Sequence, residues 1–175
     1  MKKKTLALVL ALTLLVAGVV GGTLAWLTDQ TAEVKNTFTV GDINIGLTET
    51  TTDYKMVPGN TIAKDPTVTV KANSEACWLF VKVTESTDLK DFITYAIAEG
   101  WTELEAGVYY REVPASAADQ TFSVLAGDAV TVKNDVTRTM LETAKTDAPT
   151  LTFKAYAIQR DHFATADAAW AEVSK

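Results

Sequence analysis

The sequence has little cysteine, histidine or proline. Its 175 residues include one cysteine, one histidine and four prolines. One thiol cannot build a disulfide framework or a multi-cysteine metal site, and one imidazole cannot build the H-E-x-x-H zinc motif, which needs two histidines one helical turn apart. The G-x-S-x-G, G-x-x-x-x-G-K-[ST] and G-x-G-x-x-G signatures of hydrolases and nucleotide-binding proteins are also missing. We therefore expect no catalytic centre, no cofactor and no metal site.

Basic residues are also scarce. The chain has 16 Lys and Arg against 22 Asp and Glu, which gives a formal charge of -6. Nucleic-acid binding draws its affinity from cations that neutralise phosphates, and here the basic cluster is confined to the first four residues. With 47% apolar and 22% charged residues, the composition indicates one ordinary globular domain and excludes nucleic acid as a partner.

The N-terminus has the pattern of an export signal. Three lysines precede an apolar run over residues 6–20, which ends beside two glycines. That run is shorter than the roughly 20 apolar residues of a membrane-spanning helix, and small residues precede Trp26, as signal peptidase requires. We therefore predict a signal peptide over residues 1–25 that is cleaved between Ala25 and Trp26, so that the membrane is a partner only before cleavage. The alternative is an uncleaved anchor.

The rest of the chain is rich in threonine and shows the two-residue period of β-strands. Residues 37–47 change phase at Gly41, which predicts one strand with a β-bulge. Residues 76–84 are apolar on both faces, with Trp78 and Phe80 opposite Cys77, which indicates a strand inside a sandwich or under a covering segment. The other predicted strands are residues 67–71, 92–97, 108–113, 121–125, 129–133 and 151–158.

Helical periodicity is confined to two short stretches. Residues 136–145 follow Asn134 and Asp135, either of which would cap a helix, and residues 165–173 begin at the potential cap Thr165. About eight short strands without helical crossovers favour antiparallel pairing. The sequence therefore predicts an all-β, mainly antiparallel, jelly-roll-like β-sandwich with one or two short helices over residues 37–175. An extended N-terminal arm over residues 26–36 precedes it.

Cys77 and His162 are the residues from which a nucleophile or a metal centre would have to be built. The alternation of Cys77 with Leu79 predicts a buried core thiol rather than a nucleophile paired with His162. A metal site at His162 and Asp161 would need carboxylates from distant segments, and a lone histidine beside an aspartate is usually a surface residue. The acidic residues lack calcium-loop spacing, so we expect a solvated face for Asp53, Asp65, Asp88, Asp91 and Asp128.

Several segments occur in a specific order along the chain. They are residues 21–29 (GGTLAWLTD), residues 36–45 (NTFTVGDINI), residues 57–59 (VPG) with residues 64–68 (KDPTV), and residues 155–159 (AYAIQ) ahead of Trp170. Together they resemble the camelysin/TasA family of exported Gram-positive proteins, which accompany biofilm matrix and are processed by a SipW-type signal peptidase. The resemblance implies a jelly-roll sandwich that forms extracellular fibres, with the segment after the cleavage site inserted as a strand into a neighbouring copy.

These observations lead to one expected function and several alternatives. We expect a secreted protein of the extracellular matrix or cell surface that is not an enzyme and that polymerises with itself or with related matrix proteins. Trp26 and Leu27 would anchor the arm, which carries no turn signal and which an open sheet edge could accept. The alternatives are a camelysin-type cell-surface metallopeptidase, since some members of the family carry that label, and a monomeric surface binding module. The alternative to strand donation is that Trp26 and Leu27 fold back on their own domain or fray.

Overall fold

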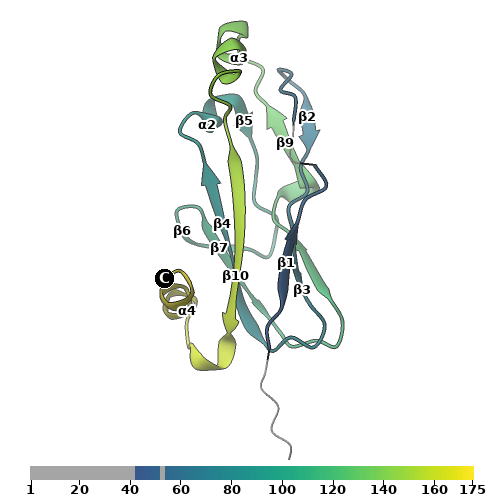
Figure 1. Ribbon diagram of the computed structural model, residues 1–175, viewed down its shortest axis with the longest axis vertical. Coiled ribbons are helices and arrows are strands. Elements are labelled where there is room, and N and C mark those ends of the chain that lie inside the picture. The colour runs from purple at the N-terminus through teal and green to yellow at the C-terminus, as the bar shows by residue number, and fades with distance from the viewer. Residues whose placement is uncertain (1–41, 52–53) are drawn as a thin grey trace, which may run out of the picture. The chain divides into compact units, whose positions relative to one another are not determined.

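The computed structural model describes residues 42–51 and 54–175 (Figure 1). The strands are β1 (Ile45–Thr48), β2 (Thr61–Ala63), β3 (Thr67–Val70), β4 (Cys77–Glu85), β5 (Ile93–Thr94), β6 (Thr102–Glu105), β7 (Val108–Val113), β8 (Gln120–Ser123), β9 (Ala129–Val132) and β10 (Leu151–Gln159). The helices are α2 (Leu89–Phe92), α3 (Arg138–Ala144) and α4 (Ala166–Val173), with the 3-10 turns η1 (Ala126–Asp128) and η2 (Arg160–His162).

The strands form two layers. One layer is a four-stranded sheet in the order β10-β4-β7-β6, and the other consists of two three-stranded sheets, β1-β3-β8 and β2-β9-β5. Every strand pair in these sheets is antiparallel. Residues of β3 and of β9 pack with residues of the same face of the four-stranded sheet, so both small sheets cover that face. The predicted all-β, mainly antiparallel sandwich is confirmed.

Strand β4 is an inner strand of the four-stranded sheet and is buried on both faces. Cys77, Leu79 and Val81 are fully buried between the layers, where they contact the valines of β3. Trp78 and Phe80 point to the opposite face, where they pack with Ala169 and Trp170 of α4. Helix α4 lies on the side of the sheet away from β1 and β3 (Figure 1). The covering segment predicted for this strand is therefore α4.

The sequence places most strands correctly, and the differences have local causes. Strand β7 has the predicted bounds, and the strands at residues 67–71, 76–84, 129–133 and 151–158 are confirmed within one residue at each end. The prediction for residues 92–97 is wrong except at Ile93–Thr94, because Phe92 ends α2 and Ile97 forms only an isolated bridge with Leu125. Residues 42–44 are not in a strand, and residues 37–41 lie outside the described residues.

The helix caps of the structure can also be compared with the caps predicted from the sequence. The side chain of Thr165 accepts a hydrogen bond from the backbone N–H of Ala168 at 3.3 Å, so this predicted cap of α4 is confirmed. The predicted caps Asn134 and Asp135 of α3 are wrong. Thr137 takes that place because its hydroxyl accepts from the N–H of Met140 at 3.3 Å. Helix α2, a single turn, adds a third short helix to the two predicted ones.

The outer face of the sheet β1-β3-β8 carries rows of hydroxyl side chains. The register places Thr48 opposite Thr67, and Thr67 opposite Ser123, so these three residues form one row across the sheet. A second row pairs Thr69 with Thr121. Cross-strand threonine pairs stabilise antiparallel sheets, so these rows favour the pairing of the three strands.

Candidate functional site

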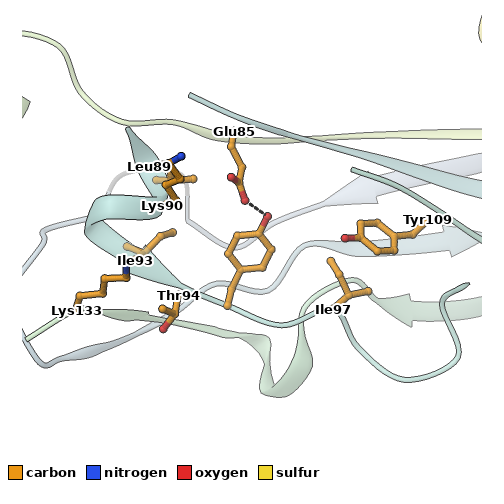
Figure 2. Close-up of a pocket in the computed structure, with 9 residues that line it drawn as sticks. Glu85, Leu89, Lys90, Ile93, Thr94, Ile97, Tyr109 and Lys133 are labelled. Carbon is orange, nitrogen blue, oxygen red and sulfur yellow. Dashed lines mark hydrogen bonds between the residues drawn. The ribbon is translucent and has the colours of Figure 1, made fainter. Parts of the chain in front are cut away.

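The sandwich has a cavity on the side formed by β5 and β7. Its volume is about 420 Å³, and it lies between the end of β4, helix α2, strand β5 and strand β7. Leu89, Ile93 and Lys133 lie on one side of it, with Ile97 and Tyr109 on the other (Figure 2). The full lining is Glu85, Leu89, Lys90, Ile93, Thr94, Tyr95, Ile97, Tyr109 and Lys133.

The polar groups that line this cavity are the hydroxyls of tyrosine and threonine and the charged groups of lysine and glutamate. The hydroxyl of Tyr95 donates to the carboxylate of Glu85, as the dashed line in Figure 2 shows. Burial raises the pKa of Tyr95, and the hydrogen bond and charge of Glu85 raise it further; burial also raises the pKa of Tyr109. Both phenols therefore stay protonated at neutral pH. Such a lining can bind a ligand by stacking and hydrogen bonding, but it offers no activated nucleophile.

Two further cavities flank the start of β10, and they form what we call the β10 groove. Their volumes are about 410 and 380 Å³, and both are lined by Lys64, Leu151 and Thr152. The first cavity extends over apolar side chains of α2 and of the sheet β2-β9-β5. The second cavity runs beside β1, where the side chain of Leu47 is 37% exposed. The first cavity is also lined by Tyr54, Met56, Ile62, Leu89, Ile93, Val130, Ala148, Pro149 and Thr150.

Lys64 is a buried cation at the centre of the β10 groove. Only 7% of this residue is exposed, and its Nζ lies 2.6 Å from Oε1 of Glu49. The same Nζ lies 4.7 Å from the ring centroid of Tyr54 and 5.4 Å from that of Phe153. The Tyr54 hydroxyl donates to Glu49 at 2.8 Å, so the carboxylate is held from two directions. Burial, followed by the hydrogen bond and charge of Glu49, raises the pKa of Tyr54.

The environment of Lys64 indicates a structural role. A buried ammonium must be paired, because an unpaired charge in a low-dielectric site costs several kcal/mol. Here one carboxylate and two aromatic faces satisfy it, so the cation bridges the segment after β1 to the segment before β3. The sequence analysis did not identify this site. The only local signal for it is one lysine between two short apolar stretches, and the partner Glu49 is 15 residues away.

Cys77 and His162 lie near the same end of the large sheet but do not form a pair. Cys77 is opposite Gln159 in the register and is fully buried, and burial raises the pKa of its thiol to about 11. His162 is exposed in η2. Because the thiolate is the nucleophile, a buried thiol with this pKa is inert at neutral pH. The predicted core role of Cys77 is confirmed.

The part of the chain that the structure describes does not fit a catalytic zinc centre. Such a centre takes three protein ligands from His, Cys, Asp and Glu. Within residues 42–51 and 54–175 there is no group of three or more of these residues placed to hold a metal ion. His162 and Asp161 are both exposed in η2, and the predicted surface position of His162 is confirmed.

Two acidic residues lie closer together than the sequence suggests. Asp65 and Asp128 line one cavity with Thr50, whereas Asp88 and Asp91 are exposed, as expected. The N–H of Thr50 donates to Asp65 at 3.0 Å and its hydroxyl donates to the other carboxylate oxygen, which lowers the pKa of Asp65. Oδ1 of Asp128 is buried without a hydrogen-bond partner in the described residues. Asp53 lies outside the described residues.

A sequence model of the camelysin metallo-endopeptidase family matches residues 1–91, which is more than half of the 175 residues. The chain belongs to this family. The resemblance seen in the sequence is thus confirmed, and camelysin family members are cell-surface proteins. The match ends within α2, so β10, α4 and His162 lie beyond it. No curated protein and no solved structure shows significant similarity to the chain.

Three sequence predictions concern residues outside the described part. They are the signal peptide over residues 1–25, the cleavage site at Ala25 and Trp26, and the anchoring role of Trp26 and Leu27, all within residues 1–41. Processing and the arm therefore stay predictions. In the described residues, no helix combines the length and the apolar character that a membrane span requires.

Proposed function

We propose that this camelysin-family protein is a secreted structural component of the extracellular matrix and that it is not an enzyme. In this proposal a signal peptidase cuts between Ala25 and Trp26, and the freed arm over residues 26–36 inserts as a strand into another copy or a related matrix protein. Fibres then grow by repeated strand donation. Membrane contact ends with the cleavage.

The main support for the proposal is that the sheets of the sandwich end in edge strands. In the described part of the chain, β10 and β6 border the large sheet, while β1, β8, β2 and β5 border the small ones. An edge strand presents unpaired N–H and C=O groups that can pair with a strand from another molecule. Strand donation between identical copies is a head-to-tail contact, and such contacts build filaments when they do not close into a ring.

The first test compares the mature chain beginning at Trp26 with a variant that lacks residues 26–34. The mature chain should show concentration-dependent light scattering and filaments in electron micrographs. The shortened chain should remain a folded monomer with unchanged circular dichroism, because only the donated segment is lost. A matched variant with Trp26→Ser and Leu27→Ser keeps the arm length and should assemble poorly, since its apolar anchors are gone.

Two results would overturn the proposal. Filaments that persist after the deletion would exclude strand donation by this arm, and a mature chain that stays monomeric at high concentration would exclude polymerisation. N-terminal sequencing of the exported protein tests the processing step on its own. It should return Trp26 as the first residue, and secreted material that still begins with Met1 would contradict the cleavage.

Membership of a metallo-endopeptidase family favours a second candidate function. If the chain is a peptidase, the purified mature protein should cleave a protein substrate, a chelator should stop the cleavage, and added zinc should restore it. His162→Ala should then abolish activity, because His162 is the sole imidazole of the chain. Chelator-sensitive cleavage with this dependence on His162 would replace the structural function with an enzymatic one.

The cavity in Figure 2 favours a third candidate, a monomeric binding module. Its phenols and lysines are suited to stacking and hydrogen bonding rather than to catalysis. This function would show no concentration-dependent assembly, and a Tyr95→Ala variant would lose ligand binding while the arm deletion would not.

A further inference from the structure

The cavity of Figure 2 gathers cations in a chain that is mostly acidic. Lys90 of α2 and Lys133, which follows β9, line it together with a single carboxylate, that of Glu85. The whole chain has 16 Lys and Arg against 22 Asp and Glu, so a lining with more cations than carboxylates differs from the rest of the molecule. A cleft whose lining has an excess of one sign of charge attracts ligands of the opposite sign. The lining therefore favours an anionic ligand.

Both lysines are available to a ligand. The backbone N–H of Lys133 donates to the carbonyl of Phe92 at 2.9 Å, which fixes this residue beside the end of α2. Lys90 and Lys133 lie on the same side of the cavity (Figure 2), and neither forms an ion pair with any residue that the structure describes. The cation of the β10 groove, Lys64, is instead paired with Glu49 at 2.6 Å. The cavity of Figure 2 thus offers ammonium groups that no described carboxylate neutralises.

The opposite side of the cavity is formed by an aromatic ring and an aliphatic side chain. Tyr109 of β7 and Ile97 lie there, and the hydroxyl of Tyr109 points into the cavity (Figure 2). Burial raises the pKa of Tyr109, so its hydroxyl is a hydrogen-bond donor at neutral pH. An aliphatic chain in this place would leave that hydroxyl without a partner. A ring that has an apolar face and hydroxyl groups at its edge satisfies both Tyr109 and Ile97.

Glu85 limits the charge of the ligand and adds an acceptor. Its Oε1 accepts from the hydroxyl of Tyr95, which leaves Oε2 for a hydroxyl donor of a ligand. Two ammonium groups and one carboxylate give the lining one net positive charge, which matches a ligand with a single carboxylate. A phosphate monoester carries about -1.5 to -2 charges at neutral pH and would be repelled more strongly by Glu85.

The cavity has the size and the access of a small-molecule site. Its volume of about 420 Å³ lies in the range of roughly 300–1,000 Å³ that is usual for ligand pockets. Glu85, Lys90 and Thr94 of its lining are exposed, so the cavity opens to solvent beside them. A sugar unit can therefore enter while the rest of a longer polysaccharide remains outside.

We infer that this cavity binds a uronic acid unit of an acidic polysaccharide. The carboxylate of the sugar is placed at Lys90 and Lys133, the ring lies against Tyr109 and Ile97, and a ring hydroxyl donates to Glu85. The inference names the ligand for the cavity that favours the third candidate function. It is also compatible with the structural function, because the site operates in a single copy and does not use the N-terminal arm. A matrix protein with this site would hold an acidic polysaccharide directly.

Isothermal titration calorimetry of the mature chain tests the class of ligand. The probes are a trisaccharide of galacturonic acid, the neutral trisaccharide of galactose, and benzoate, which is an aromatic monoanion without hydroxyl groups. The acidic trisaccharide should bind about 2- to 30-fold more tightly than the neutral one, because it alone pairs with the two ammonium groups. Added salt should reduce this difference. Equal binding of the two trisaccharides, no binding of the acidic one, or tighter binding of benzoate would overturn the inference.

Variants of the two lysines locate the carboxylate of the ligand. Lys90→Met and Lys133→Met should each weaken binding of the acidic trisaccharide about 1.5- to 5-fold. In the double variant the two trisaccharides should bind equally, because the charge that distinguishes them has no partner left. Lys82→Met removes an exposed charge of β4 outside the lining and should change neither affinity. A double variant that still prefers the acidic trisaccharide would place the carboxylate elsewhere and contradict the inference.

A variant of the aromatic side tests the contact with the sugar ring. Tyr109→Phe keeps the ring and removes the hydroxyl, so it should weaken binding of both trisaccharides about 2- to 12-fold through the loss of one hydrogen bond. Thermal unfolding should show that this variant and the lysine variants fold. An unchanged affinity for both trisaccharides would mean that the ligand does not lie against Tyr109, and the inference would be wrong.

The arm deletion separates this inference from the proposed structural function. The variant that lacks residues 26–34 should bind the acidic trisaccharide with the affinity of the mature chain, because the arm is not part of the cavity. If this variant binds the sugar and still forms filaments, strand donation is wrong and the inference stands. If it no longer binds the sugar, the site depends on the arm and the inference fails, while strand donation is judged by the filaments alone.

Discussion

The two faces of β4 are buried in different ways. The inner face carries the aliphatic and thiol side chains Cys77, Leu79 and Val81, and hydrogen-bonded strands of the second layer cover it. The outer face carries Trp78 and Phe80, which are covered by the eight-residue helix α4. An eight-residue helix is too short to be stable alone in water. The outer face must therefore depend on specific aromatic and hydrogen-bond contacts, whereas the inner face depends on close packing between layers.

The contacts of α4 support this difference. The ring centroid of Trp170 lies 5.3 Å from that of Phe80 and 5.2 Å from that of Tyr156, with an edge-to-face arrangement in the second pair. The indole N–H of Trp78 donates to the carbonyl of Phe163 at 3.1 Å, and that of Trp170 donates to Glu105 at 2.8 Å. Each tryptophan thus both fills space and fixes the helix.

The largest expected effect comes from removing a large side chain on either face. Phe80→Ala should lower the free energy of unfolding by about 3–5 kcal/mol and Leu79→Ala by about 2–5 kcal/mol, because both side chains are fully buried and leave cavities. Thr84→Ala, at an exposed position of the same strand, should change it by less than about 0.5 kcal/mol. Urea denaturation measures all three. A loss below about 1 kcal/mol for Phe80→Ala would show that the α4 face contributes little to the fold.

Removing one indole hydrogen bond on each face sharpens the comparison. Trp78→Phe leaves the carbonyl of Phe163 without its partner and should cost about 1–3 kcal/mol. Trp101→Phe is the matched control on the inner side, since its N–H donates to the carbonyl of Ser123 at 2.9 Å. Hydrogen exchange should become faster in α4 for the first variant only. Equal acceleration in α4 from both variants would contradict a separate role for the outer face.

The helix cap provides a smaller test. Thr165→Ala removes the hydroxyl that accepts from the N–H of Ala168, and we expect a loss of about 1 kcal/mol, with α4 amides exchanging faster. Thr165→Ser keeps the hydroxyl and should behave like the unmodified chain. Thr137→Ala removes the equivalent cap of α3 and should affect α3 alone. An unchanged exchange rate in α4 after Thr165→Ala would mean that packing alone holds this helix.

The smallest effect concerns alkaline pH and the inner face. Burial raises the pKa of Cys77 from 9.0 to about 11, so the folded protein keeps this proton where the unfolded chain releases it. The stability contributed by the neutral thiol is present below pH 9 and is lost as the pH rises toward 11, by about 1 kcal/mol or less at pH 10. Denaturation of the unmodified chain and of Cys77→Ala at pH 8 and 10 measures it. A pH dependence that is identical in both would contradict the assignment to Cys77.

The parts of the fold that were predictable are those in which a single segment carries its own pattern. Strand β7 and the two-faced β4 alternate clearly, and their bounds follow from that alternation. Strand β6 has one apolar residue, Leu104, in four, so its extended form depends on pairing with β7 across the turn at Gly107. Phe92 ends a helical turn because α2 packs it into the core ahead of β5, which no local pattern shows.

The candidate sites were harder to predict than the strands because each depends on distant segments. The sequence indicated that Cys77 would be buried, because its neighbours repeat on one face. The pairs Glu49 with Lys64 and Glu85 with Tyr95 are 15 and 10 residues apart, and only the packing of their strands and loops brings them together. A lone charge between short apolar stretches gives no hint of its partner.

The hydroxyl rows on the sheet β1-β3-β8 give this face a surface whose charge does not change with pH. Thr48, Thr67, Ser123, Thr69 and Thr121 carry no group that ionises in water. The hydration of these rows is therefore the same in acidic and alkaline surroundings, and salt does not screen anything within them. The charge of the carboxylates elsewhere in the molecule depends on pH and is screened by salt, whereas these hydroxyl rows stay uncharged.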